Sequence, residues 1–163
     1  MCIRDSSVPG VYAVGDVNGG PQFTYISLDD FRIVFGALTG NGQYTLKDRK
    51  NIPYTTFLTP PLARVGLTEE DAINKGYTVK TKEMLVATMP RAHVNDYLKG
   101  AFKIVVNAEN NLILGATLYS QGAEELINLI KMAMDNNIPY TYFKNQIFTH
   151  PTMVENLNDL CNF

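Results

Sequence analysis

Hydrophobic and polar positions alternate along the first 51 residues in a way that predicts one strand and one helix. The apolar run at 11–14 lies between Pro-Gly and Gly-Asp, which is typical of a short buried strand. From Thr24 to Leu38, apolar residues recur among charged ones at helical spacing. Thr24 is suited to cap this helix, and Gly40 and Gly42 follow its end. Residues 40–51 are polar and are interpreted as a linker.

The remainder of the chain predicts an α+β unit. Strands are expected over 54–58, 64–66, 77–88, 101–106 and 112–119, and helices over 68–76, 122–136 and 152–161, with a short element at 142–148. The polar residues 107–111 join two of these strands as a hairpin. The helix over 122–136 is apolar on more than one face, so we expect it to pack on two sides.

These patterns predict an antiparallel sheet with flanking helices over 52–163. It is preceded by a strand and a helix over 7–51, an α/β piece that is too small to hold a core alone. Residues 1–6 show no periodicity and resemble a translated sequencing adaptor. We therefore expect a non-native start and a chain that is the C-terminal part of a longer protein. The alternative is a frayed native N-terminus.

Composition narrows the class of protein. The chain has 163 residues, of which 45% are hydrophobic and 18% charged, as in an ordinary globular protein. The net charge of −2 gives no reason to expect nucleic acid or an anionic membrane as a partner. No apolar run approaches a membrane span, and no secretory signal is recognised. Cys2 and Cys161 lie at opposite ends and indicate free thiols in a reducing, cytoplasmic setting rather than disulfides or zinc.

Two features near the first predicted strand suggest ligand binding. Gly15 and Asp16 follow the strand's carboxyl end, where ligands of open α/β sheets bind, and Asp16 could accept hydrogen bonds from ribose-type hydroxyls. The simpler interpretation is a turn-forming aspartate. The helix that begins near Thr24 has free N–H groups and a positive dipole end, which would stabilise negative charge on a ligand. Every helix has such an end, so this signal is weak.

The sharpest candidate is the cluster of His150, Pro151, Thr152 and Glu155. A carboxylate five residues after a histidine can orient the imidazole, fix its tautomer and stabilise its charged form. An acid–base histidine that works beside a thiol needs this arrangement. The alternative is a capping histidine and a surface glutamate. His93, the other histidine, has no metal-ligand spacing to His150 or Cys161, so no metal site is expected.

Taken in order, the motifs resemble those of the flavoprotein disulfide reductases, which include glutathione reductase, dihydrolipoamide dehydrogenase and mercuric reductase. The resemblance covers the chain from residue 7. The matching segments are 8–16 (VPGVYAVGD), 53–61, 63–69, 114–116, 123–128 and 150–155 (HPTMVE). Segments 19–30, 90–92 and 146–151 are similar to those of bacterial reactive-chlorine resistance enzymes that reduce hypothiocyanous acid with NADPH.

This resemblance implies roles for the candidate residues. Gly15 and Asp16 would contact the ribityl chain of FAD, and Gln22, Phe23 and Thr24 would lie near the flavin's pyrimidine edge. Residues from about 52 onward would form the dimerisation domain of a homodimer. His150 and Glu155 of one subunit would complete the active site of the other, with His150 as the acid–base group for a redox thiol.

The chain departs from the family pattern in one important respect. It has neither the Cys-x4-Cys redox pair nor the G-x-G-x-x-G fingerprint, so FAD and NAD(P)H would be bound mainly by upstream domains. Alone, the chain is expected neither to hold FAD tightly nor to oxidise NADPH. A non-catalytic dimerisation or binding module remains an alternative. Mercuric reductases of this family usually carry a pair of adjacent cysteines near the C-terminus, so the single Cys161 argues against that alternative. Dihydrolipoamide dehydrogenases usually have a second histidine two residues before the one that matches His150, and Phe148 at that position weakens this alternative.

Overall fold

The computed structural model describes residues 4–163, and its contacts divide the chain into two compact units. The first ends at Lys50 and the second is Asn51–Phe163. Part of the expected non-native start, residues 1–3 with Cys2, lies outside the described residues. Arg4 and Asp5 of that start do contact the first unit, since Arg4 Nε lies 2.7 Å from Asp30 Oδ1 and Asp5 forms a bridge with Tyr12.

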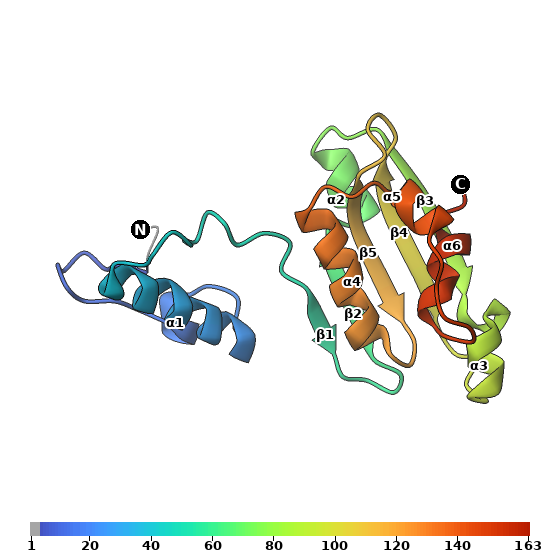
Figure 1. Ribbon diagram of the computed structural model, residues 1–163, viewed down its shortest axis with the longest axis horizontal. Helices are drawn as coiled ribbons and strands as arrows, with labels where there is room; N and C mark the ends of the chain where they lie inside the picture. Colours follow the sequence, from blue (N-terminus) through green and yellow to red (C-terminus); the bar gives the residue numbers. More distant parts are fainter. Residues whose placement is uncertain (1–3) are drawn as a thin grey trace. The chain divides into compact units, whose positions relative to one another are not determined.

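The first unit is a 3-10 turn, η1 (Gly15–Asn18), followed by the helix α1 (Thr24–Thr39), drawn in blue in Figure 1. The helix is confirmed, but its N-cap is Phe23, without a side-chain cap, rather than Thr24. It ends at Gly40, whose φ of +77° is the left-handed conformation that glycine tolerates.

The strand expected over 11–14 does not form, and that prediction is wrong. The segment makes one isolated bridge, between Tyr12 and Asp5, and Val11 and Val14 remain 51% and 43% exposed. A strand is stable only when a neighbour satisfies its backbone groups. Within the described part of the first unit, no second strand pairs with this segment.

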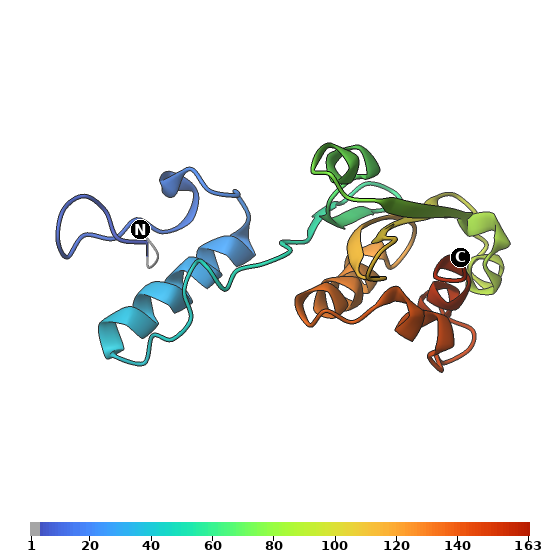
Figure 2. The ribbon, with the colours of Figure 1, turned by 90° about the horizontal axis from the view of Figure 1, so that it is seen from above.

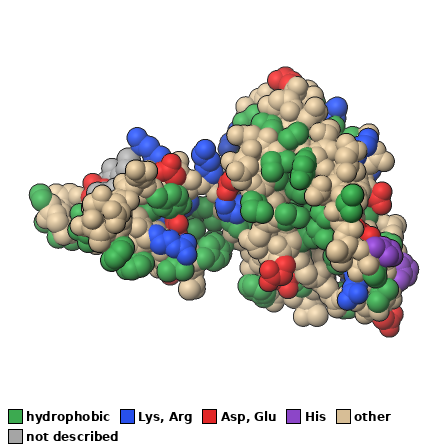
Figure 3. Space-filling model, viewed as in Figure 1, with side chains coloured by type: hydrophobic (Ala, Val, Ile, Leu, Met, Phe, Trp, Pro, Cys, Tyr) green, Lys and Arg blue, Asp and Glu red, His purple; other side chains and the backbone are tan. Residues whose placement is uncertain are grey.

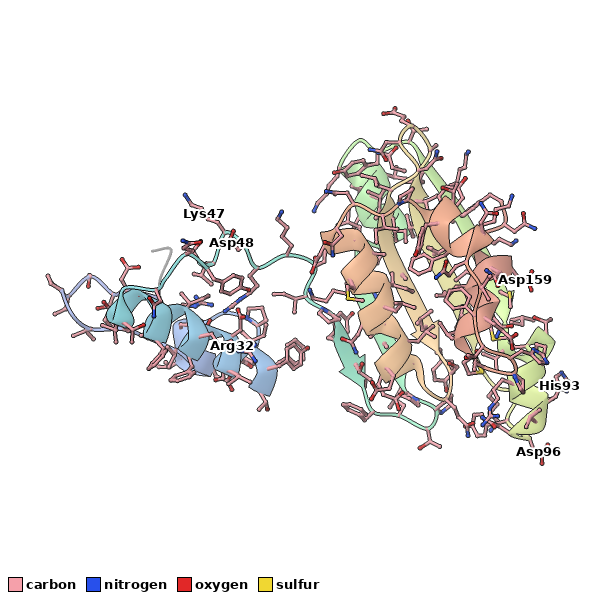
Figure 4. The ribbon with its side chains drawn as sticks, in the orientation of Figure 1. Arg32, Lys47, Asp48, His93, Asp96 and Asp159 are labelled. Atoms are coloured by element: carbon pink, nitrogen blue, oxygen red, sulfur yellow. The ribbon has the colours of Figure 1, made fainter. Side chains whose placement is uncertain are left out.

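The polar segment after α1 is more than a linker. The Asp48 carboxylate, labelled in Figure 4, accepts hydrogen bonds from the Thr45 amide and hydroxyl and closes a turn. The next residue, Arg49, reaches back to α1, where its Nε lies 2.6 Å from Asp29 Oδ2 and its guanidinium also contacts Asp30. The end of this segment is therefore tied to the first unit.

The second unit contains the predicted antiparallel sheet, now with five strands in the order β1-β2-β5-β4-β3 (Figure 1). Their bounds are β1 (Tyr54–Thr56), β2 (Leu62–Gly66), β3 (Val79–Leu85), β4 (Ala101–Asn107) and β5 (Ile113–Tyr119). The expected hairpin is confirmed as β4–β5, with Ile104 opposite Ala116. The register shifts between Val105 and Val106.

Helices lie on both faces of this sheet, as Figure 2 shows: α2 (Glu69–Asn74) on one side, and α4 (Ala123–Asp135), α5 (Tyr140–Asn145) and α6 (Leu157–Leu160) on the other. Thr68 is the N-cap of α2 and forms a capping box with Asp71. The core lies between the sheet and α4–α6, where Phe102, Leu118, Ile130 and Leu160 are fully buried.

Two predicted elements need correction, one strand and one helix. The strand expected over 77–88 ends at Leu85 and is followed by a 3-10 turn, η2 (Val86–Thr88), and by the short helix α3 (Pro90–Val94), which was not predicted. The helix expected over 152–161 is a 3-10 turn, η3 (Val154–Asn156), followed by α6. Helix α4 buries one face against the sheet, and Met132 on another face is 57% exposed, so packing on a second side stays a prediction. None of the described helices is both long enough and apolar enough to cross a membrane.

Candidate functional site

His150 and Glu155, the strongest candidates from the sequence, are in direct contact. His150 Nδ1 lies 2.8 Å from Glu155 Oε2. Because an ionised carboxylate can only accept, Nδ1–H donates to it and the tautomer of His150 is fixed. The His150 side chain is 68% exposed, whereas that of Glu155 is 19% exposed. The pair therefore places a partly sheltered carboxylate behind an imidazole that solvent and ligands can reach.

The turn that holds Glu155 is built by Thr152. The Thr152 amide donates to Glu155 Oε1 at 2.9 Å, and the Thr152 hydroxyl donates to the Thr149 carbonyl oxygen at 2.7 Å. Hydrogen bonds from the Thr152 amide and from His150 lower the pKa of the Glu155 carboxyl from its ordinary value. Glu155 is thus held ionised, and each of its oxygens has a defined partner.

This geometry leaves the second ring nitrogen of His150 available for chemistry. With Nδ1 engaged by Glu155, Nε2 has no partner in the described part of the chain. An imidazole that is oriented by a carboxylate through one nitrogen can take and return a proton at the other. Figure 3 shows histidine side chains at the surface of the second unit, on the side of α3.

In the first unit, Gly15 and Asp16 form the start of η1. Gly15 is buried, has a φ of +72°, and packs so closely that a Cβ would lie 2.3 Å from Ser27 Oγ. Asp16 is exposed, and its carboxylate has no hydrogen-bond or ion-pair partner among residues 4–163. The turn therefore presents an ionisable acceptor group beside the beginning of α1.

The other predicted cofactor residues lead into the same helix. Gln22 and Thr24 are exposed, and Phe23 is the N-cap residue of α1. The Phe23 ring stacks on the Tyr25 ring, with centroids 5.2 Å apart. The predicted cofactor residues Gly15 and Asp16 thus lie with the start of α1 in the first unit. The predicted catalytic residues His150 and Glu155 lie in the second unit.

Sequence reasoning missed Asp30 and Arg49. Asp30 is fully buried on α1 and accepts hydrogen bonds from the Gly15 amide, Asn18, Arg4 and Arg49. Burial opposes its ionisation. The hydrogen bonds, first that from Arg49, outweigh burial and lower the pKa of Asp30 to about 2. The sequence did contain a sign of the role of Asp30. This residue lies on the same helical face as Ile26 and Ile33, where an aliphatic residue is expected.

The remaining candidates carry no site. His93 Nε2 lies 2.8 Å from the Ala87 carbonyl oxygen, and Figure 4 places His93 on α3 near Asp96. Cys161 is buried, and burial raises the pKa of its thiol to about 12, so it does not supply a thiolate. In the described ranges, no three His, Cys, Asp or Glu side chains are grouped so that they could hold a metal ion.

Comparison with known proteins identifies relatives of the chain. The family model described as "Pyridine nucleotide-disulphide oxidoreductase, dimerisation domain" matches residues 52–161. The chain is 48% identical, over 95% of its length, to the probable pyridine nucleotide-disulfide oxidoreductase RclA of Escherichia coli K12. It is 35% identical over 90% of its length to a mercuric reductase of Staphylococcus aureus.

A solved structure agrees with these matches. The structure titled "HOCl-induced flavoprotein disulfide reductase RclA from Escherichia coli" is 46% identical and covers 98% of the chain, with a TM-score of 0.94. The chain covers 37% of that structure, 35% of the curated RclA and 27% of the mercuric reductase. It therefore spans about a third of the length of these relatives. The resemblance inferred from the sequence motifs is confirmed.

Proposed function

The chain belongs to the pyridine nucleotide-disulphide oxidoreductase family, and we propose that it is the C-terminal part of an FAD-dependent NAD(P)H:disulfide-type oxidoreductase. In this proposal it supplies an acid–base pair, His150 and Glu155, one edge of the FAD site, and the dimer interface. The observation that carries the proposal is the 2.8 Å contact between His150 Nδ1 and Glu155 Oε2.

The chemistry proposed for the pair follows from its hydrogen bonds. Glu155 accepts from Nδ1–H, so His150 exchanges a proton at Nε2 with a thiol brought to it. When the imidazole is charged, the ionised Glu155 at 2.8 Å stabilises that charge. The Thr152 amide keeps Glu155 in place during both proton transfers, since it binds the oxygen that His150 does not use.

The residues of the first unit fit one edge of an FAD site. Asp16 offers an exposed carboxylate that can accept hydrogen bonds from ribityl hydroxyls. The neighbouring Gly15 packs against Ser27 in the first turn of α1, whose N-terminal amides can stabilise negative charge on a ligand. When bound, FAD would pass electrons from NAD(P)H toward the disulfide-type substrate. We assign Gly15, Asp16, Gln22, Phe23 and Thr24 to this edge.

For the substrate we propose a small oxidant such as hypothiocyanous acid or a related reactive-chlorine product. This proposal is supported by the 48% sequence identity to RclA, which the solved structure describes as an HOCl-induced flavoprotein disulfide reductase.

We also propose that the enzyme is a homodimer, in line with the name of the matched domain, and that His150 of one subunit serves the active site of the other. Use of NAD(P)H favours a cytoplasmic enzyme.

The test is made on the full-length enzyme, with His150→Gln and with His93→Gln as the matched control. Loss of the acid–base group should lower kcat/KM for NADPH-dependent substrate reduction by about 100- to 10,000-fold, whereas His93→Gln should leave it unchanged. Glu155→Gln should cause a smaller loss, since it removes the orienting charge but not the imidazole. An equal loss in both histidine variants would contradict the assignment.

Dimerisation is tested separately, by mixing subunits. A full-length subunit that lacks the redox cysteines is co-expressed with one that carries His150→Gln. If the site is shared, mixed dimers contain one intact site, and activity returns although each variant is inactive alone. If each site lies within one subunit, the mixture stays inactive, and the proposed contribution of His150 to the partner is wrong.

A further inference from the structure

The buried carboxylate of Asp30 divides its two oxygens between two tasks. Oδ2 accepts from the Gly15 amide at 2.9 Å and from Asn18 Nδ2 at 2.7 Å. Oδ1 accepts from Arg4 Nε and from the guanidinium of Arg49. One oxygen therefore faces the η1 turn and the other faces positive charge.

The two donors to Oδ2 come from the first and last residues of η1, Gly15 and Asn18. Asp16 lies between them and has no partner of its own in the described part of the chain. Asn18 extends the arrangement, since its Oδ1 accepts from the Gly20 amide at 2.9 Å. Because the Asp30 carboxylate is hydrogen-bonded to both ends of η1, the position of the Asp16 side chain depends on Asp30.

Arg49 supplies the counter-charge that stabilises the buried Asp30 carboxylate. A buried carboxylate without a counter-charge is costly, and Arg49, with a side chain 8% exposed, supplies one. Its Nε also binds Asp29 Oδ2 at 2.6 Å, so the guanidinium is held from two sides. Arg4 adds a second cation, with its Nε 2.7 Å from Asp30 Oδ1.

We propose that Asp30, with Arg49 as its counter-ion, is a positioning residue that holds the Gly15–Asn18 turn so that Asp16 is presented to FAD. This inference rests on the proposed function, because it takes the turn as an edge of the FAD site. It assigns Asp30 no contact with the cofactor. The effect of Asp30 on FAD is transmitted through the backbone of the turn and through Asp16.

The experiment compares Asp30→Ala with Asp29→Ala in the full-length enzyme. Asp29 is the same residue type on the same helix, and it shares Arg49, but it makes no hydrogen bond to the η1 turn. FAD dissociation constants are measured by flavin fluorescence after removal of the cofactor. Asp30→Ala should weaken FAD binding about 10- to 100-fold, and Asp29→Ala by less than about threefold.

A double-variant cycle separates positioning from a purely structural role. If Asp30 acts through Asp16, then Asp16→Ala/Asp30→Ala should bind FAD no more weakly than Asp16→Ala alone. If Asp30→Ala instead destabilised the whole first unit, the double variant would bind FAD more weakly than Asp16→Ala alone. Without FAD, amide hydrogen exchange on the chain should show faster exchange at Gly15 in Asp30→Ala and unchanged exchange in β4.

The outcomes are distinct. If wild-type enzyme binds FAD and Asp30→Ala binds it equally well, or if the two substitutions are additive, the inference is wrong while the proposed function stands. If wild-type enzyme holds no FAD, the proposed function fails, and the inference with it. If Asp30→Ala does not fold, Asn18→Ala replaces it, since it removes one of the two turn contacts and leaves the Arg49 pair intact. Unchanged FAD affinity in Asn18→Ala would then overturn the inference.

Discussion

Gly15→Ala is the most informative single substitution in the first unit, because it tests the shape of the turn that carries Asp16. Two effects oppose an alanine there. The φ of Gly15 is +72°, and a Cβ would lie 2.3 Å from the hydroxyl oxygen of Ser27. The same Cβ would lie 3.5 Å from Ser27 Cβ, which is an ordinary contact. The overlap therefore involves only the hydroxyl group.

The magnitudes of the two effects can be separated. Left-handed backbone costs a non-glycine residue about 1–2 kcal/mol, and the lower entropy of the unfolded alanine chain offsets about 0.5–1 kcal/mol of this. Moving the Ser27 hydroxyl to a less favourable rotamer costs about 1 kcal/mol more. Gly15→Ala should therefore destabilise the first unit by about 2 kcal/mol. In a Ser27→Ala background, where the overlap is absent, the cost should fall to about 1 kcal/mol.

The assay is native-state amide hydrogen exchange, which reports the stability of each unit separately. Amides of α1 around Ile33, which is fully buried, report the first unit, and amides of β4 serve as the internal reference. Equal costs of Gly15→Ala in the two backgrounds would show that Ser27 does not restrict the turn. No cost in either background would refute the left-handed conformation at Gly15 and, with it, the geometry on which the Asp30 inference is built.

Asp30, Cys161 and Gly115 each allow one further prediction. The pKa of Asp30 is about 2 in the folded chain against an ordinary 3.8, so its contribution is present above pH 4. Exchange of α1 amides should show a loss of about 2 kcal/mol as the pH falls from 4 toward 2. Cys161 should resist alkylation at pH 8 until the chain unfolds, since its thiol is buried with a pKa of about 12; rapid labelling of native protein would contradict this. Gly115→Ala would place a Cβ 2.1 Å from the Leu67 carbonyl oxygen, and denaturant titration should show that the second unit loses about 3 kcal/mol.

The elements predicted well are those whose signals are local. The β4–β5 hairpin could be predicted because the polar residues 107–111 act within a few residues of the strands that they join. The expected strand over 11–14 failed because a strand depends on a partner, which a local pattern cannot supply. The expected helix over 152–161 failed for a related reason. Thr152 and Glu155 hydrogen-bond to each other, and Glu155 also binds His150, which favours a turn over a regular helix.

The same distinction explains which site residues could be found. His150 and Glu155 are five residues apart, so one turn of chain brings them together and their spacing alone suggested an acid–base pair. Asp30, by contrast, joins groups 12 to 26 residues away along the chain, and each of those groups is unremarkable by itself. What marks Asp30 is its place among buried aliphatic residues of α1. A charge at such a position is expensive unless distant donors converge on it, so its presence implies partners before any of them is identified.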